Sequence, residues 1–170
     1  MVISSDVQLK GTEWNKALTS LETIFRTRTN YSIFLLSATI GVMYDKQIIT
    51  PKENGEDVSY VPRTVLHNHS EDLDFLFQTA IITTKTEDFS EETRLLLAFG
   101  DDKENDFEKM KFLVKFANFG VTKLNERLGN NTLETMENIK DFLASTMEGT
   151  NFEINSLSDE EIDIDDSDLI

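Results

Sequence analysis

The sequence has no cysteine, two prolines, two histidines, and 16 basic residues against 32 acidic ones. The lack of cysteine excludes disulfide bonds, a thiol nucleophile and thiolate ligands for a metal ion. The shortage of Lys and Arg leaves a formal net charge of −16. This charge argues against a duplex-binding surface, because affinity for nucleic acid comes mainly from cations that neutralise phosphates.

Long hydrophobic runs are also missing. No segment approaches the roughly 18 consecutive apolar residues of a membrane-spanning helix, and the N-terminus lacks the basic stretch and apolar run of a signal peptide. We therefore expect a cytoplasmic protein that does not enter a membrane. With 170 residues, of which 39% are hydrophobic, the chain is long enough for a single compact domain with its own core.

Acidic residues are concentrated at the C-terminal end. Between Glu153 and Ile170 there are eight acidic residues and no Lys or Arg. Self-repulsion predicts a disordered acidic tail over residues 151–170, after a helical domain over residues 1–150. Three roles stay open for the tail: a solubility tail, a strip that mimics phosphates in a basic nucleic-acid channel, or a docking peptide anchored by Ile162, Ile164, Leu169 and Ile170.

Apolar periodicity predicts a mostly α domain of about five to six helices. Steps of three and four residues are clearest from Phe107 to Leu128, and the run from Tyr31 to Met43 is apolar or small on nearly every face, as in a central helix. Ser37, Ala38 and Gly41 in that run are small enough to allow a neighbouring helix or loop to approach closely. Further helices are expected from Thr12, from a cap at Ser70, from a cap at Ser90 to Gly100, and from a capping box at Asn131 to Met147.

The stretch between residues 44 and 62 breaks this pattern with charged residues, Pro and Asn-Gly. Asn54-Gly55 favours a tight turn, so we expect a small β-hairpin with strands at Gln47–Thr50 and Val58–Tyr60. The basic residues that are able to gather lie around this stretch. They either solubilise the surface or face an acidic partner or one strand of nucleic acid: Arg26, Arg28, Lys46, Lys52 and Arg63.

A second aromatic stripe lies on the predicted long helix. Phe112, Phe116 and Phe119 are neighbours at helical spacing, but they fall off the main apolar stripe. Such a stripe indicates either a helix that is buried on two sides or an exposed patch that a partner covers. These three residues are the candidate partner-binding residues of the domain.

Catalytic signals are weak throughout. His67-Asn68-His69 spells the name of a nuclease motif, but that motif needs a further metal-binding His downstream, and the chain has only two His. Acidic pairs such as Asp72 with Asp74 fit helix starts, where the helix dipole stabilises carboxylates. There is no Gly-rich phosphate loop and no Gly-x-Ser-x-Gly sequence. We therefore expect no catalytic residue, no metal and no cofactor.

Four segments resemble a known family: Tyr31 to Val42, Val61 to Leu66, Asp72 to Phe77, and Phe116 to Leu124. Together they are similar to the Dnd-system-associated proteins, small accessory products found with bacterial DNA phosphorothioation and related phage-defence gene sets. The resemblance covers about residues 29 to 128. It implies a partner-bound role in DNA modification or anti-phage defence, without catalytic residues to carry over.

We therefore expect a non-catalytic accessory or regulatory subunit. Its expected partner is a DNA-processing defence enzyme encoded nearby, so that it meets nucleic acid only indirectly. Two alternatives remain: an acidic DNA mimic whose tail blocks a partner's nucleic-acid groove, and an enzyme of an unrecognised kind.

Overall fold

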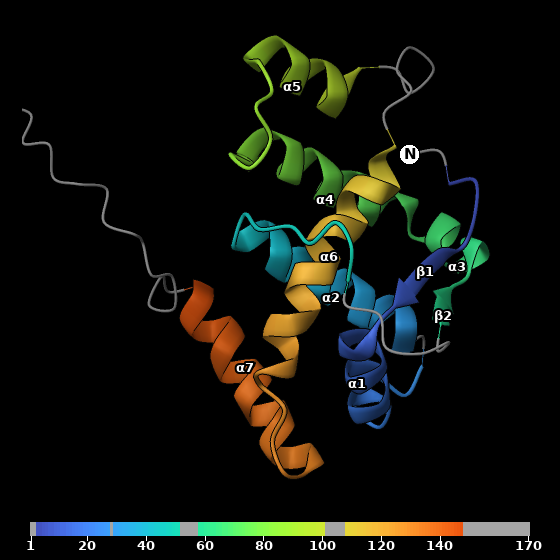
Figure 1. Ribbon diagram of the computed structural model, residues 1–170, viewed down its shortest axis with the longest axis vertical. Coiled ribbons are helices and arrows are strands. Elements are labelled where there is room, and N and C mark those ends of the chain that lie inside the picture. The colour runs from blue at the N-terminus through green and yellow to red at the C-terminus, as the bar shows by residue number, and fades with distance from the viewer. Residues whose placement is uncertain (1–2, 28, 52–57, 101–107, 148–170) are drawn as a thin grey trace, which may run out of the picture.

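The computed structural model describes residues 3–27, 29–51, 58–100 and 108–147. Helices dominate this part of the chain, so the predicted mostly α class is confirmed. Figure 1 shows the elements in chain order: β1 (Val7–Lys10), α1 (Thr12–Leu21), α2 (Thr29–Met43), β2 (Val58–Val61), α3 (Arg63–Asn68), α4 (Ser70–Thr83), α5 (Glu91–Phe99), α6 (Lys109–Asn125) and α7 (Thr132–Met147).

Helices α2 and α6 cross at the centre of the fold (Figure 1). A Cβ atom added to Gly41 of α2 would overlap the backbone of Phe116, and one added to Gly120 of α6 would overlap the Ser37 carbonyl oxygen. Only glycine allows the two backbones to approach this closely. The prediction that small residues on the central helix admit a neighbouring helix or loop is therefore confirmed, and the neighbour is the helix α6.

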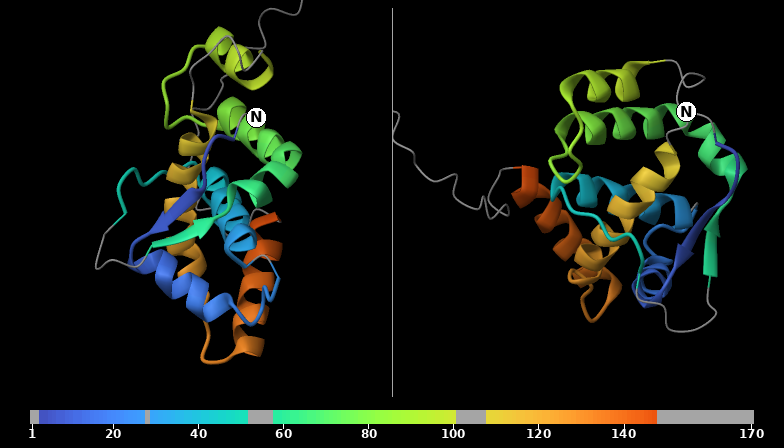
Figure 2. Two further views of the ribbon diagram at one scale, coloured as in Figure 1. Left: turned by 90° about the vertical axis from the view of Figure 1, so that its right-hand side faces the viewer. Right: turned by 45° about the horizontal axis from the view of Figure 1, so that its top comes forward.

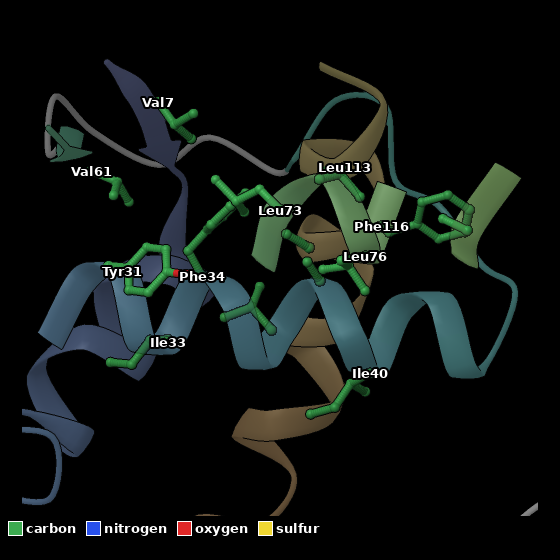
Figure 3. Close-up of a cluster of buried hydrophobic side chains, with 14 of the residues drawn as sticks. Val7, Tyr31, Ile33, Phe34, Ile40, Val61, Leu73, Leu76, Leu113 and Phe116 are labelled. Atoms are coloured by element: carbon green, nitrogen blue, oxygen red, sulfur yellow. The ribbon is translucent and has the colours of Figure 1, made fainter. Parts of the chain in front are cut away.

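The hydrophobic core gathers around this crossing. Burial of each large apolar side chain contributes about 1.5–3 kcal/mol relative to exposure. The buried side chains around this crossing therefore provide most of the stability of the fold. The strands close one side of the core, and α4 covers another part of it. Figure 3 shows the main contributors: Phe34 of α2, Leu113 and Phe116 of α6, Leu73 and Leu76 of α4, and Val7 and Val61 of the strands.

The two strands pair antiparallel, with Val7 opposite Val61. Strand β1 alternates as a half-buried strand does: Val7 and Leu9 are buried and Gln8 is exposed. The predicted strand that begins at Val58 is thus confirmed. Its partner is a segment near the N-terminus, for which no strand was predicted.

The predicted first strand of the hairpin, at residues 47–50, is wrong. These residues lie along α6 without forming a strand: the Ile48 amide donates to the Lys115 carbonyl (2.9 Å), and the Ile48 carbonyl accepts from the Asn118 side chain (3.1 Å). Because the Ile48 backbone groups form their hydrogen bonds with α6, they do not pair with a second strand. The predicted turn at Asn54-Gly55 lies outside the described residues.

The starts of α5 and α7 follow their local sequence signals. The Ser90 side chain caps α5 and the Asn131 side chain caps α7, each accepting from the amide three residues onward (3.2 and 3.0 Å). Ser70, in contrast, is the first residue of α4 and does not cap it. Helix α3 runs almost directly into α4, and the His69 carbonyl accepts from the first turn of α4.

Two further boundaries differ from prediction. The long helix was expected over residues 107–128, but α6 spans Lys109–Asn125, with residues 101–107 outside the described part. The segment Arg63–Asn68, for which no helix was predicted, forms the short helix α3, which raises the count above the expected five to six. Pro62, with its fixed φ, directly precedes α3 and favours its start.

Candidate interaction surface

Helix α5 lies at the outer edge of the molecule, beside α4 (Figure 1, Figure 2). Its inner side is anchored by Arg94, whose guanidinium donates to the carbonyls of Ile81 (2.6 Å) and Glu87 (3.1 Å). The guanidinium carbon also lies 5.8 Å from the centre of the Phe89 ring. Leu97 is buried on the same side. These contacts hold α5 against α4 in a fixed orientation.

The outer side of α5 is apolar. Leu95, Leu96 and Phe99 are 53%, 51% and 64% exposed. Residues three and four apart share one side of a helix, so these three side chains form a single stripe, which we call the α5 face. Exposed apolar residues are ordinary when they are scattered, whereas contiguous exposed apolar patches are typical of interaction sites.

Helix α4 adds exposed apolar residues of its own. Phe75 and Ile82 are exposed, two helical turns apart, and so lie on one side of α4. That side is opposite the one that carries the buried Leu73, Leu76 and Phe77. The α4–α5 pair therefore turns apolar residues outward from both of its helices.

The α4–α5 region is also strongly acidic. Between residues 70 and 100 the chain has seven acidic and two basic residues, a net charge of −5. One of the two cations, Arg94, is directed at backbone carbonyls and lies on the inner side. Glu91 and Glu92, in the first turn of α5, are exposed. A molecule that approaches the α5 face therefore meets apolar side chains within a negative field.

Exposed apolar residues elsewhere are fewer on each element. On α7, Leu133 is 66% exposed and Met136 is 49% exposed. Ile49 and Tyr60 are exposed singly, in the 44–50 segment and on β2. The α7 pair matches the α5 residues in exposure, and this makes it a useful control surface.

The predicted aromatic stripe is mostly internal. Phe112 and Phe116 are buried, their rings meet edge to face at 5.1 Å, and Phe77 adds a second edge contact to Phe112 at 5.8 Å. Phe119 is half-buried, 5.9 Å from the Tyr44 ring. The structure thus shows the buried alternative for Phe112 and Phe116, because α4 packs on this side of α6 and leaves neither ring to a partner.

The other predicted partner-binding residues are those of the tail. Ile162, Ile164, Leu169 and Ile170 lie outside the described residues, so their role as anchors stays a prediction. Of the basic residues, Arg28 and Lys52 also lie outside them. The Lys46 ammonium lies 5.9 Å from the Phe119 ring centre, and Arg63 begins α3.

Buried amides join elements that are distant in the sequence. Asn118 of α6 accepts from the Trp14 indole (2.9 Å) and donates to the Ile48 carbonyl. Asn125, two turns further along the same side of α6, donates to the Glu13 carbonyl (2.8 Å) and carboxylate (2.7 Å). These hydrogen bonds were not predicted. The one signal for them in the sequence is the presence of polar residues within an otherwise apolar helical stripe.

The two histidines differ in their surroundings. The His69 ring stacks on Tyr31 with centroids 4.5 Å apart, and its Nδ1 lies 3.2 Å from the Asp72 carboxylate. His67 is exposed on α3. Among the residues that the structure describes, no group of three or more His, Asp or Glu side chains is arranged to hold a metal ion.

Comparison with known proteins gives no family: no family model, no curated protein and no solved structure matches this chain. The resemblance to the Dnd-system-associated proteins therefore stays a prediction. Within the described ranges, no helix has both the length and the apolar character needed to cross a bilayer.

Proposed function

We propose that this chain is a non-catalytic accessory subunit that binds a protein partner through the α5 face. The observation that carries the proposal is the exposure of Leu95, Leu96 and Phe99 on a helix whose opposite side is firmly anchored. These three side chains add little to the stability of the fold, because they remain exposed to water. Burial of the same side chains by a partner is favourable through the hydrophobic effect.

The partner that we propose is a DNA-processing enzyme of a bacterial DNA-modification-linked defence system, acting in the cytoplasm. The sequence resemblance over about residues 29 to 128 supports this choice. The negative charge of the chain supports an indirect relation to DNA, because a protein of net charge −16 is repelled by phosphates and reaches DNA only through a basic partner.

Co-expression with the products of adjacent genes, followed by size-exclusion chromatography, tests the proposal. An interface above about 1,000 Å² survives the column, so the chain should elute with one of these products at a constant ratio. The matched control is the chain with Leu96→Gln and Phe99→Gln. Elution of the chain alone in every combination, or turnover of a nucleic-acid substrate by the purified chain, would contradict the proposed function.

A further inference from the structure

We infer that the α5 face binds a basic amphipathic helix of the partner protein. This inference rests on the proposed function and specifies the chemistry of the segment that is recognised. Two features of the face lead to it: the arrangement of its apolar side chains and the sign of the charges around them.

The first feature is the shape of the apolar stripe. Leu95, Leu96 and Phe99 occupy positions i, i+1 and i+4 of one helix, so they form a short ridge along its axis. A ridge of this kind packs into the groove between side chains of a second helix. An amphipathic helix offers such a groove on its apolar side, with anchors at three- and four-residue spacing.

The second feature is charge. Glu91 and Glu92 are exposed at the start of α5, and Asp88 is exposed just before it. The surrounding region, residues 70–100, has a net charge of −5. Lys and Arg on the flanks of a docking helix would pair with these carboxylates and raise the rate of encounter.

The same charges argue against the two occupants that the chain itself offers. A second copy would bring an equal negative region against the first. The segment from Glu153 to Ile170 has apolar anchors, but it carries eight acidic residues and no basic one. Like charges in an interface cost binding free energy, so a basic partner fits the face better than either of these.

The face is also ready to bind without rearrangement. The Ser90 cap fixes the first turn of α5, and the Gly100 amide closes its last turn on the Leu96 carbonyl (2.8 Å). Arg94 holds the inner side through two backbone carbonyls. A helix that is already ordered loses little conformational entropy on association, which favours affinity.

A synthetic helix tests this inference on the full chain. The probe is a fluorescent peptide of about 18 residues, built of Leu and Lys with the Leu at helical spacing, a length near the minimum for a stable helix. Fluorescence anisotropy should give a Kd on the order of 10 µM at low salt. Binding should weaken as NaCl is raised, since salt screens the carboxylates around the α5 face.

Two pairs of substitutions locate the binding site. Leu96→Gln with Phe99→Gln removes apolar surface without a change of charge and should weaken binding about tenfold or more. Leu133→Gln with Met136→Gln, at matched exposure on α7, should leave the Kd unchanged within about twofold. A peptide of the same composition with Leu and Lys evenly mixed should bind at least about tenfold more weakly than the amphipathic one.

Several results would overturn the inference. Equal binding of the two peptides, or equal weakening by the α5 and α7 substitutions, would mean general attraction of a cation to an acidic protein. Self-association in sedimentation that Leu96→Gln with Phe99→Gln abolishes would assign the face to a second copy. Tighter peptide binding by the full chain with Ile162→Ser and Ile164→Ser would assign it to the tail.

Failure of this inference can be told apart from failure of the proposed function. If a co-expressed partner still elutes with the Leu96→Gln, Phe99→Gln chain, the accessory role stands and the α5 face is not its site. If the peptide binds at the α5 face but no neighbouring gene product does, the surface chemistry stands and the proposed partner is wrong.

Discussion

The crossing of α2 and α6 and the pair of α4 and α5 use the same residue types for different purposes. At the crossing, Leu113 and Phe116 are fully buried, and two glycines bring the backbones into contact. On α5, Leu96 and Phe99 are more than half exposed. The difference teaches that apolar composition alone does not define a core. The number of sides on which a helix is covered decides whether its Leu and Phe stabilise the fold or remain available to a partner.

The largest effect is expected from matched truncations of two phenylalanines. Phe116→Ala should lower the free energy of unfolding by about 3–5 kcal/mol, because it empties space at the α2–α6 crossing. Phe99→Ala should change it by about 0.5 kcal/mol or less, because that ring already lies mostly in water. Urea denaturation of both variants measures the difference. Similar losses for the two would show that α5 belongs to the core.

A smaller effect is expected from one added methyl group at the crossing. Gly120→Ala should destabilise the fold by about 3 kcal/mol, since the new Cβ overlaps the Ser37 carbonyl and forces α2 and α6 apart. The sign of this stability change is informative, because Gly→Ala in an exposed helix stabilises the protein by about 1 kcal/mol. Thermal unfolding followed by circular dichroism would show it, and a rise in Tm would contradict the close crossing.

The smallest effect should be confined to α5. Arg94→Met keeps the apolar stem and removes the donors to Ile81 and Glu87, for an expected loss of about 2 kcal/mol in the stability of this helix. Arg94→Lys, as a control, keeps the charge but lacks the planar group that reaches both carbonyls, so it should fall in between. Hydrogen exchange of α5 amides measures the loss. Unchanged exchange would show that Arg94 does not anchor the helix.

Local signals predicted most of the elements. The periodic stripe of α6, the small residues of α2, and the caps at Ser90 and Asn131 depend on residues within a few positions of one another, and they were predicted correctly. The pairing of β2 was not predicted correctly. Its partner is some fifty positions away, and the residues expected to pair with it bond to α6 instead.

The candidate site shows the same division. Phe112 and Phe116 were named from the sequence as candidate partner-binding residues, because they lie on an aromatic stripe. In the structure both side chains are buried within the domain. Leu95 and Leu96 look like ordinary core residues of a short helix, and they are exposed because only one side of α5 packs on its neighbour. A helix with apolar residues on two sides does not reveal in its sequence which side a neighbour covers.

The sequence by itself determined the helical class, the acidic charge, the close-packing residues of the central helix and the capped starts of α5 and α7, because these follow from backbone preferences and short-range spacing. Tertiary structure alone decided the partner of β2, the buried amide contacts of Asn118 and Asn125, and the exposure of the α5 face. Each of these depends on which distant segments meet, and that is set by the packing of the whole domain around α2 and α6.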